Sequence, residues 1–110
     1  MLPKDRRLTR QQFWQVAQEG FKVHSSQFIV KHHPNNLGYS RWAIVTSTKL
    51  SKKAVVRNKL RRKIYNALRH ETWDLGFDVI IFPRPAVLNL DDAKISNAVN
   101  QMVSKVSGLA

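Results

Sequence analysis

The sequence contains no cysteine, so it has neither a disulfide framework nor a thiolate metal site, and a reducing compartment suits it. It has no apolar run near the ~20 residues that a membrane-spanning helix needs. Its first ten residues include four cations and lack the apolar core of a signal peptide. We therefore expect a cytoplasmic protein.

Acidic residues are scarce: seven Asp and Glu stand against 19 Lys and Arg, giving a formal net charge of +12. No carboxylate lies between Glu19 and Glu71, so the positive charge is concentrated. A nucleic acid is the natural partner for such a stretch, because binding releases counterions. The charge alone also allows an anionic membrane surface or an ordinary basic surface.

The same scarcity argues against a protein-only nuclease, which needs clustered carboxylates to hold Mg²⁺. Asp91 and Asp92 are expected to begin a helix, and the other acids are dispersed. His32 and His33 are adjacent in a predicted strand, so they point to opposite faces and do not suit one metal ion. There is no glycine-rich phosphate loop and no nucleophile constellation, so we assign no catalytic residue and no metal site.

The pattern along residues 1–110 predicts a single α+β domain in the order α-β-β-α-β-α, with a small sheet packed against three helices. Thr9 and Gln12 form a capping-box pattern before a helix at 10–19, which Gly20 ends. A last amphipathic helix from residue 91 or 92 onward closes the core.

Strands are predicted at 21–33 and 39–47, and we expect these two to pair as a hairpin. In the first strand Phe28, Val30 and His32 share one face. A third strand at 77–82 is apolar on both faces, which places it in the middle of the sheet.

A long helix is predicted over 52–70, with Ser51 as its cap. Its apolar stripe consists of Val56, Leu60, Ile64, Ala67 and Leu68. The opposite face consists of Asn58, Arg61, Arg62, Tyr65 and Arg69. Like charges one turn apart, such as Arg57 and Arg61, each destabilise a helix by a few tenths of a kcal/mol, and closely spaced phosphates would compensate.

We predict that RNA binds this helix and the segment before it. The candidate residues are Lys49, Lys52, Lys53, Arg57, Asn58, Lys59, Arg61, Arg62, Tyr65 and Arg69. The planar guanidinium of Arg grips phosphate oxygens and stacks on bases. Asn58 and Tyr65 suit base or ribose edges, or else are an ordinary polar residue and a half-buried ring.

The run AVVRNKLRR at 54–62 resembles the signature of the bacterial ribonuclease P protein component, in which Arg-Asn is followed after two residues by a basic pair. Segments 8–20, with Phe13, and 77–86 resemble the family's opening segment and its late strand and turn. Four positions depart from the pattern: Tyr65 replaces an Arg, Leu50 replaces a Lys, and Ala17 and Lys31 replace aromatic residues.

The resemblance implies an α/β sandwich with a left-handed β-α-β crossover, a handedness that general rules disfavour. It also implies that the basic helix binds ribonuclease P RNA and that a cleft between sheet and first helix binds the 5′ leader of precursor tRNA. Cleavage is then carried out by the RNA with Mg²⁺, which the RNA mainly holds, and the protein is the non-catalytic subunit of this endoribonuclease. We expect the protein alone to be a monomer that does not bind membranes.

The candidates for leader contacts are Phe13, Phe28, Val30, Lys31 and Arg84. Aromatic and apolar side chains on an exposed strand face would stack on unpaired bases. Phe28 and Val30 fit the core equally well. A structural ribosomal or general nucleic-acid-binding protein is the alternative function, because its charge would be the same.

Overall fold

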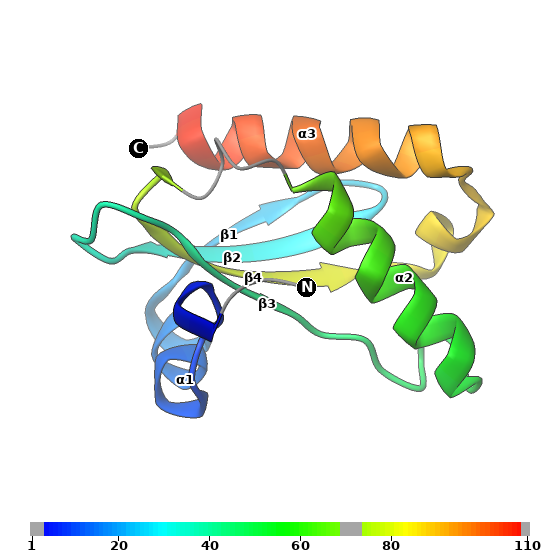
Figure 1. Ribbon diagram of the computed structural model, residues 1–110, viewed down its shortest axis with the longest axis horizontal. Helices are drawn as coiled ribbons and strands as arrows, with labels where there is room; N and C mark the ends of the chain where they lie inside the picture. Colours follow the sequence, from blue (N-terminus) through cyan, green and yellow to red (C-terminus); the bar gives the residue numbers. More distant parts are fainter. Residues whose placement is uncertain (1–3, 69–73, 109–110) are drawn as a thin grey trace.

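The computed structural model describes residues 4–68 and 74–108, and these form three layers (Figure 1). A four-stranded sheet lies in the middle, α1 covers one face, and α2 and α3 cover the other. The elements in chain order are η1 (Lys4–Arg6), α1 (Arg10–Glu19), β1 (Phe21–His24), β2 (Phe28–Pro34), β3 (Arg41–Ile44), α2 (Ala54–Ala67), β4 (Phe77–Pro83), η3 (Pro85–Asn89) and α3 (Asp92–Gly108). The predicted α+β class, with three α-helices on a small sheet, is confirmed for the described residues.

The sheet has the strand order β1-β2-β4-β3, in which β3 and β4 are parallel and the other pairs antiparallel. The central position predicted for 77–82 is confirmed, but the predicted hairpin between 21–33 and 39–47 is wrong, since β4 lies between β2 and β3. The range 21–33 is itself a hairpin of β1 and β2, closed where Ser25 Oγ accepts a hydrogen bond from the Phe28 N–H. Alternation in a sequence shows the faces of a strand and not its partner.

The parallel neighbours β3 and β4 are joined through α2, so these elements form the β-α-β unit that the resemblance implies. The left-handed sense of this crossover stays a prediction. Helix α2 begins at Ala54 rather than 52, because Ser51 Oγ accepts from the Lys53 N–H within the preceding turn. It ends at Ala67, short of the predicted 70, because Leu68 has an extended backbone.

The main core lies between the sheet and the helices α2 and α3. Phe28 and Val30 of β2 are buried there, with 0% and 1% of their surface exposed, together with Leu60 and Ile64 of α2. The buried row on α3 consists of Ile95, Val99, Met102, Val103 and Val106. The predicted apolar sides of both helices are thus confirmed, with Val56 half-buried at the margin.

Helix α1 begins with the predicted capping box: the Thr9 side chain accepts from the Gln12 N–H, and the Gln12 side chain accepts from the Thr9 N–H. It ends at Gly20, whose N–H donates to the Val16 carbonyl oxygen. A Cβ at Gly20 would lie 2.5 Å from that oxygen and 3.1 Å from the His32 carbonyl oxygen of β2. Glycine is therefore required here by the close approach of α1 to the sheet. Its backbone conformation does not require glycine, because any residue adopts a φ of −71°.

Gly20→Ala is expected to lower the free energy of unfolding by about 1–3 kcal/mol, because the added methyl group forces α1 away from β2. Gly38→Ala is the matched control, since a Cβ there meets nothing within 4 Å and its effect should stay within about 0.5 kcal/mol. Urea denaturation of both variants measures the difference. Equal stability of the two would show that α1 does not pack as closely as described.

Candidate nucleic-acid interface

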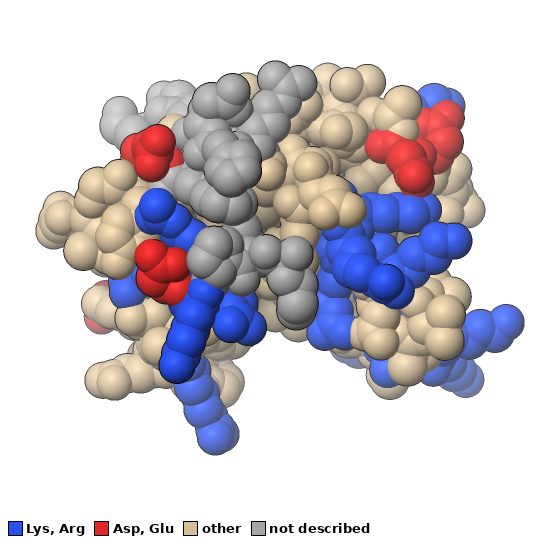
Figure 2. All heavy atoms as spheres, in the orientation of Figure 1, with Lys and Arg blue, Asp and Glu red and all other residues tan. Residues whose placement is uncertain are grey.

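The face of α2 opposite the core carries closely spaced cations, and Figure 2 shows Lys and Arg side chains gathered over this helix. Asn58 and Arg62 are exposed, and the half-buried Arg61 donates a hydrogen bond from its guanidinium to the Asn58 side-chain oxygen. Among the described residues, Lys63 is the one α2 cation that forms an ion pair. This face is therefore open and positively charged. Arg69, the last predicted member, lies outside the described residues.

The segment that leads into α2 extends this charge. Its lysines are exposed, as is the lysine in the second turn of the helix: Lys49, Lys52, Lys53 and Lys59. The half-buried Arg57 is fixed differently, because its Nη1 donates to the Ser51 carbonyl oxygen at 2.8 Å. That hydrogen bond ties the first turn of α2 to the preceding loop, so the loop cations are held beside the helix.

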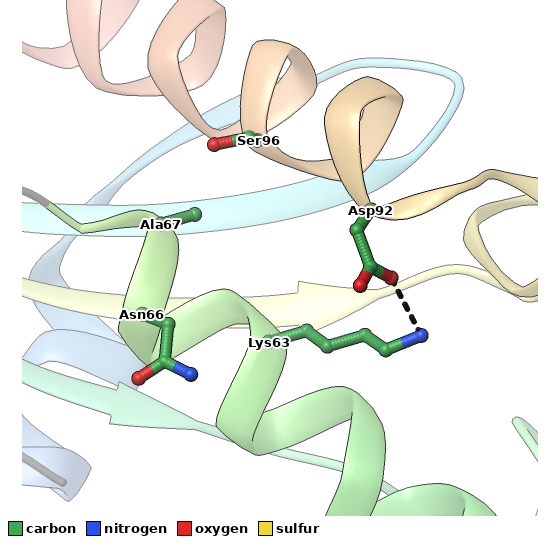
Figure 3. Close-up of a pocket in the computed structure, with 5 residues that line it drawn as sticks. All are labelled: Lys63, Asn66, Ala67, Asp92 and Ser96. Atoms are coloured by element: carbon green, nitrogen blue, oxygen red, sulfur yellow. Dashed lines mark ion pairs between the residues drawn. The ribbon is translucent and has the colours of Figure 1, made fainter.

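A groove of about 190 Å³ between α2 and α3 marks one edge of the cationic face (Figure 3). Lys63 Nζ of α2 lies 2.8 Å from Asp92 Oδ1 of α3 across this groove. The hydrogen bond and the charge of Lys63 hold the pKa of the Asp92 carboxyl below its ordinary value. Lys63 therefore connects two helices, whereas the exposed Lys59 and Arg62 of α2 form no ion pair with a described carboxylate.

A larger hollow of about 380 Å³ lies on the other side, lined by Ile44 of β3 and by Asn58, Arg61, Arg62 and Tyr65 of α2. Tyr65 is half-buried and packs against the core, so it is less exposed than the predicted binding face required. Burial raises the pKa of Tyr65, and the charges of Arg61 and Arg7 act in the opposite direction. Arg7 belongs to the segment before α1, is exposed and forms a β-bridge with Trp42 of β3.

The sheet face covered by α1 contains two of the predicted leader contacts. Phe13 is half-buried on α1, and its ring meets the Trp14 ring edge to face, with centroids 5.9 Å apart. Trp14 is 55% exposed. Lys31 of β2 donates from Nζ to the Ala17 carbonyl oxygen at 2.9 Å, which fastens α1 to the sheet.

The expectation that Phe28, Val30 and His32 form an exposed surface beside Phe13 is wrong. These residues alternate with Lys31 along β2, so they face away from α1 and are buried in the core. Arg84, also predicted as a leader contact, is exposed after β4. Its Nη1 donates to the Ser25 carbonyl oxygen at 3.3 Å, which holds it at the turn between β1 and β2.

His32 is buried between the rings of Phe21 and Phe77, whose centroids lie 5.8 and 5.7 Å from its own. Neither ring nitrogen has a hydrogen-bond partner among the described residues. Burial lowers the pKa of His32 from its ordinary 6.5, and the neighbouring His33 lowers it further. Protonated imidazole is therefore disfavoured in the folded chain.

His32 binds a proton more readily in the unfolded chain than in the folded one. The free energy of unfolding is therefore expected to decrease as pH falls below 6.5 and to be unaffected by His32 above that pH. Urea denaturation between about pH 7.5 and pH 5 measures this loss. His32→Leu should show a smaller loss of stability over the same interval. An identical pH dependence in the variant would rule out His32 as its source.

Comparison with known proteins identifies the family of this chain. The sequence profile of the family described as Ribonuclease P matches residues 2–107. The chain belongs to the ribonuclease P protein family. The ribonuclease P protein component of Chromohalobacter salexigens is 36% identical over 87 residues, which cover 78% of this chain and 68% of the relative. The ribonuclease P protein component of Synechocystis is 32% identical over 108 residues, which cover 94% of this chain and 87% of the relative.

The fold agrees with this family. The ribonuclease P protein from Thermotoga maritima superposes with a TM-score of 0.80 at 27% identity, covering 90% of this chain and 96% of that chain. Within the part of the chain that the structure describes, no helix has the length and hydropathy to cross a bilayer.

The departures from the ribonuclease P pattern have structural explanations. Leu50, where the family pattern has a Lys, is 7% exposed and belongs to the core. Ala17 and Lys31, where aromatic residues are frequent, contact each other through the hydrogen bond described above. Tyr65, in place of an Arg, lines the larger hollow. The fold of a ribonuclease P protein is kept with these residues in place.

Sequence reasoning missed the buried ion pair that joins β3 to β4. Both oxygens of Asp78 accept hydrogen bonds from Arg41, each at 2.7 Å, and Asn35 Nδ2 donates to Oδ1 at 3.0 Å. Arg41 is therefore half-buried and paired within the sheet although it lies in the cation-rich stretch. The available signal was an acid in an otherwise apolar strand, because a buried carboxylate needs a cationic partner.

Proposed function

We propose that this protein is the RNA-binding subunit of ribonuclease P and that the outward face of α2 binds the ribonuclease P RNA. The observation that carries the proposal is the open cationic side of α2, where Asn58, Arg61 and Arg62 belong to the family signature. Guanidinium groups bind phosphate oxygens through paired hydrogen bonds. Because the opposite side of α2 packs into the core, the backbone positions of these residues are fixed.

We further propose that the sheet face beside α1 binds the 5′ leader of precursor tRNA. Support comes from Phe13 and the exposed Trp14, whose rings are available for stacking on unpaired bases, and from the cation of Lys31 nearby. Phe28 and Val30 are not part of this surface because they are buried.

Cleavage of the leader is proposed to be carried out by the RNA with Mg²⁺, which the RNA mainly holds. In the described residues, no group of three or more His, Asp or Glu side chains is placed to hold a metal ion. The side chains of this protein are proposed to take no part in the chemical step. Its proposed contributions are affinity for the RNA and discrimination between substrates, and it is proposed to act as a monomer within the ribonucleoprotein.

The test is reconstitution of the protein with its cognate ribonuclease P RNA at low Mg²⁺, followed by an assay of precursor tRNA trimming. The expected result is faster removal of the leader than with RNA alone. No stimulation at any Mg²⁺ concentration would contradict the proposal. A general nucleic-acid-binding protein would bind random duplex as tightly as single-stranded leader at matched salt, so that comparison separates the two functions.

A further inference from the structure

The hollow between β3 and α2 combines two kinds of surface. Ile44 and Tyr65 supply an apolar wall, and Asn58, Arg61 and Arg62 supply hydrogen-bond donors. A site for a bare phosphate needs only the donors. The apolar wall therefore points to a ligand that has a flat apolar part as well as a negative charge.

The apolar wall is held in place by the core. Ile44 is 9% exposed and belongs to the core cluster, and Tyr65 is half-buried against that cluster. Neither side chain can swing away without losing these contacts. A rigid aromatic side chain binds a flat ligand with little loss of conformational entropy.

Two cations line the hollow, Arg61 and Arg62. The Arg61 guanidinium is anchored by its hydrogen bond to Asn58. The exposed Arg62 has no ion pair with any described carboxylate. The charge of Arg7 also reaches Tyr65, so positive charge comes from the segment before α1 as well as from α2.

We propose that this hollow holds one unpaired nucleotide of RNA, with its base against Tyr65 and Ile44 and its phosphate on Arg61 and Arg62. The inference rests on the proposed function and names the feature of RNA that α2 recognises. A base inside a duplex is stacked on its neighbours and cannot reach an apolar wall, whereas an unpaired base exposes its flat face. The site therefore selects loops, bulges or single strands over continuous duplex.

The test compares three probes at matched ionic strength: adenosine 5′-monophosphate, ribose 5-phosphate and inorganic phosphate. Each is titrated into the isotope-labelled full chain, and amide chemical shifts around Tyr65 report binding. Since base stacking strengthens binding by about 5- to 150-fold, the nucleotide should bind that much more tightly than ribose 5-phosphate. Equal affinities for all three probes would show an anion site only and would overturn the proposal.

Variants of Tyr65 test whether its ring causes the preference for the nucleotide. Tyr65→Leu keeps an apolar side chain against the core but removes the ring, and it should abolish the preference for the nucleotide. Tyr65→Phe should keep it, and so should Phe21→Ala, which removes an exposed aromatic residue of β1 that has no proposed part in RNA binding. If Tyr65→Leu retains the full preference, the base binds elsewhere and the proposal fails.

The same proteins are then reconstituted with ribonuclease P RNA and assayed for precursor tRNA trimming. Stimulation by the unaltered chain without any preference for the nucleotide would overturn the hollow as a base site and leave the proposed function intact. Preference for the nucleotide without stimulation of trimming would support the hollow as a base site and contradict the proposed function. The two inferences therefore fail separately.

Discussion

Arg41→Leu is expected to lower the free energy of unfolding by about 3–5 kcal/mol, because it leaves the Asp78 carboxylate buried without its charge partner. The side chains of Arg41 and Asp78 are only 18% and 6% exposed, so water replaces the lost guanidinium only in part. Asn35 would still donate one hydrogen bond, which does not balance a full negative charge. Urea denaturation at neutral pH measures the loss.

The double variant Arg41→Leu with Asp78→Val is the control for this prediction. Replacing both charges by apolar residues removes the uncompensated carboxylate, so the double variant should be more stable than Arg41→Leu alone. Asp78→Val alone completes a double-mutant cycle, which isolates the interaction between the two side chains. If the double variant is less stable than the single one, lost packing at the sheet rather than an unpaired charge explains the effect.

Arg61→Ala combined with Arg62→Ala is expected to weaken binding of ribonuclease P RNA about tenfold or more for each residue. A hydrogen bond to a charged group is worth about 1.5–3 kcal/mol, and 1.4 kcal/mol corresponds to a factor of ten. The slope of log K against log salt should also fall by about one for each lost phosphate contact. Filter binding over a series of salt concentrations measures both quantities.

Lys94→Ala combined with Lys105→Ala provides the matched control, because it also removes two exposed cations, both on α3 rather than α2. Its affinity and salt slope should stay close to those of the unaltered chain. Equal reductions in both variants would mean that net charge alone, and no particular face, determines RNA binding. The circular dichroism spectrum of each variant verifies that the fold is retained.

Much of the fold follows from local signals in the sequence. The bounds of α1 and the start of α3 were predicted because capping is encoded in adjacent residues such as Thr9 and Gln12. The buried sides of α2 and α3 follow from helical spacing of apolar residues. The central place of β4 follows because its residues are apolar on both faces.

The pairing of strands could not be predicted, because it depends on contacts between distant segments. β4 follows α2 in the chain and lies between β2 and β3 in the sheet. No local pattern in 21–47 indicates this position. Phe28 and Val30 are buried rather than exposed because α2 and α3 cover their face of the sheet. The pair of Arg41 and Asp78 also joins distant segments, since β3 and β4 lie on either side of α2.

The candidate RNA-binding side was largely predictable, because one helix carries it. Helical periodicity separates Asn58, Arg61 and Arg62 from the apolar stripe without knowledge of the fold. The hollow was not predictable, since Ile44 reaches it from a different element. Periodicity assigns a residue to a face, but only tertiary packing shows what lies beside that face.

Tethered cleavage of the RNA tests most directly whether the outward side of α2 meets it. Because the chain has no cysteine, a single Lys59→Cys or Gln101→Cys variant carries one radical-generating probe, on α2 or on the exposed side of α3 respectively. The probe on α2 should cut the bound ribonuclease P RNA at a few discrete sites, and the probe on α3 should cut weakly or not at all. Strong cleavage from α3 with none from α2 would contradict the account.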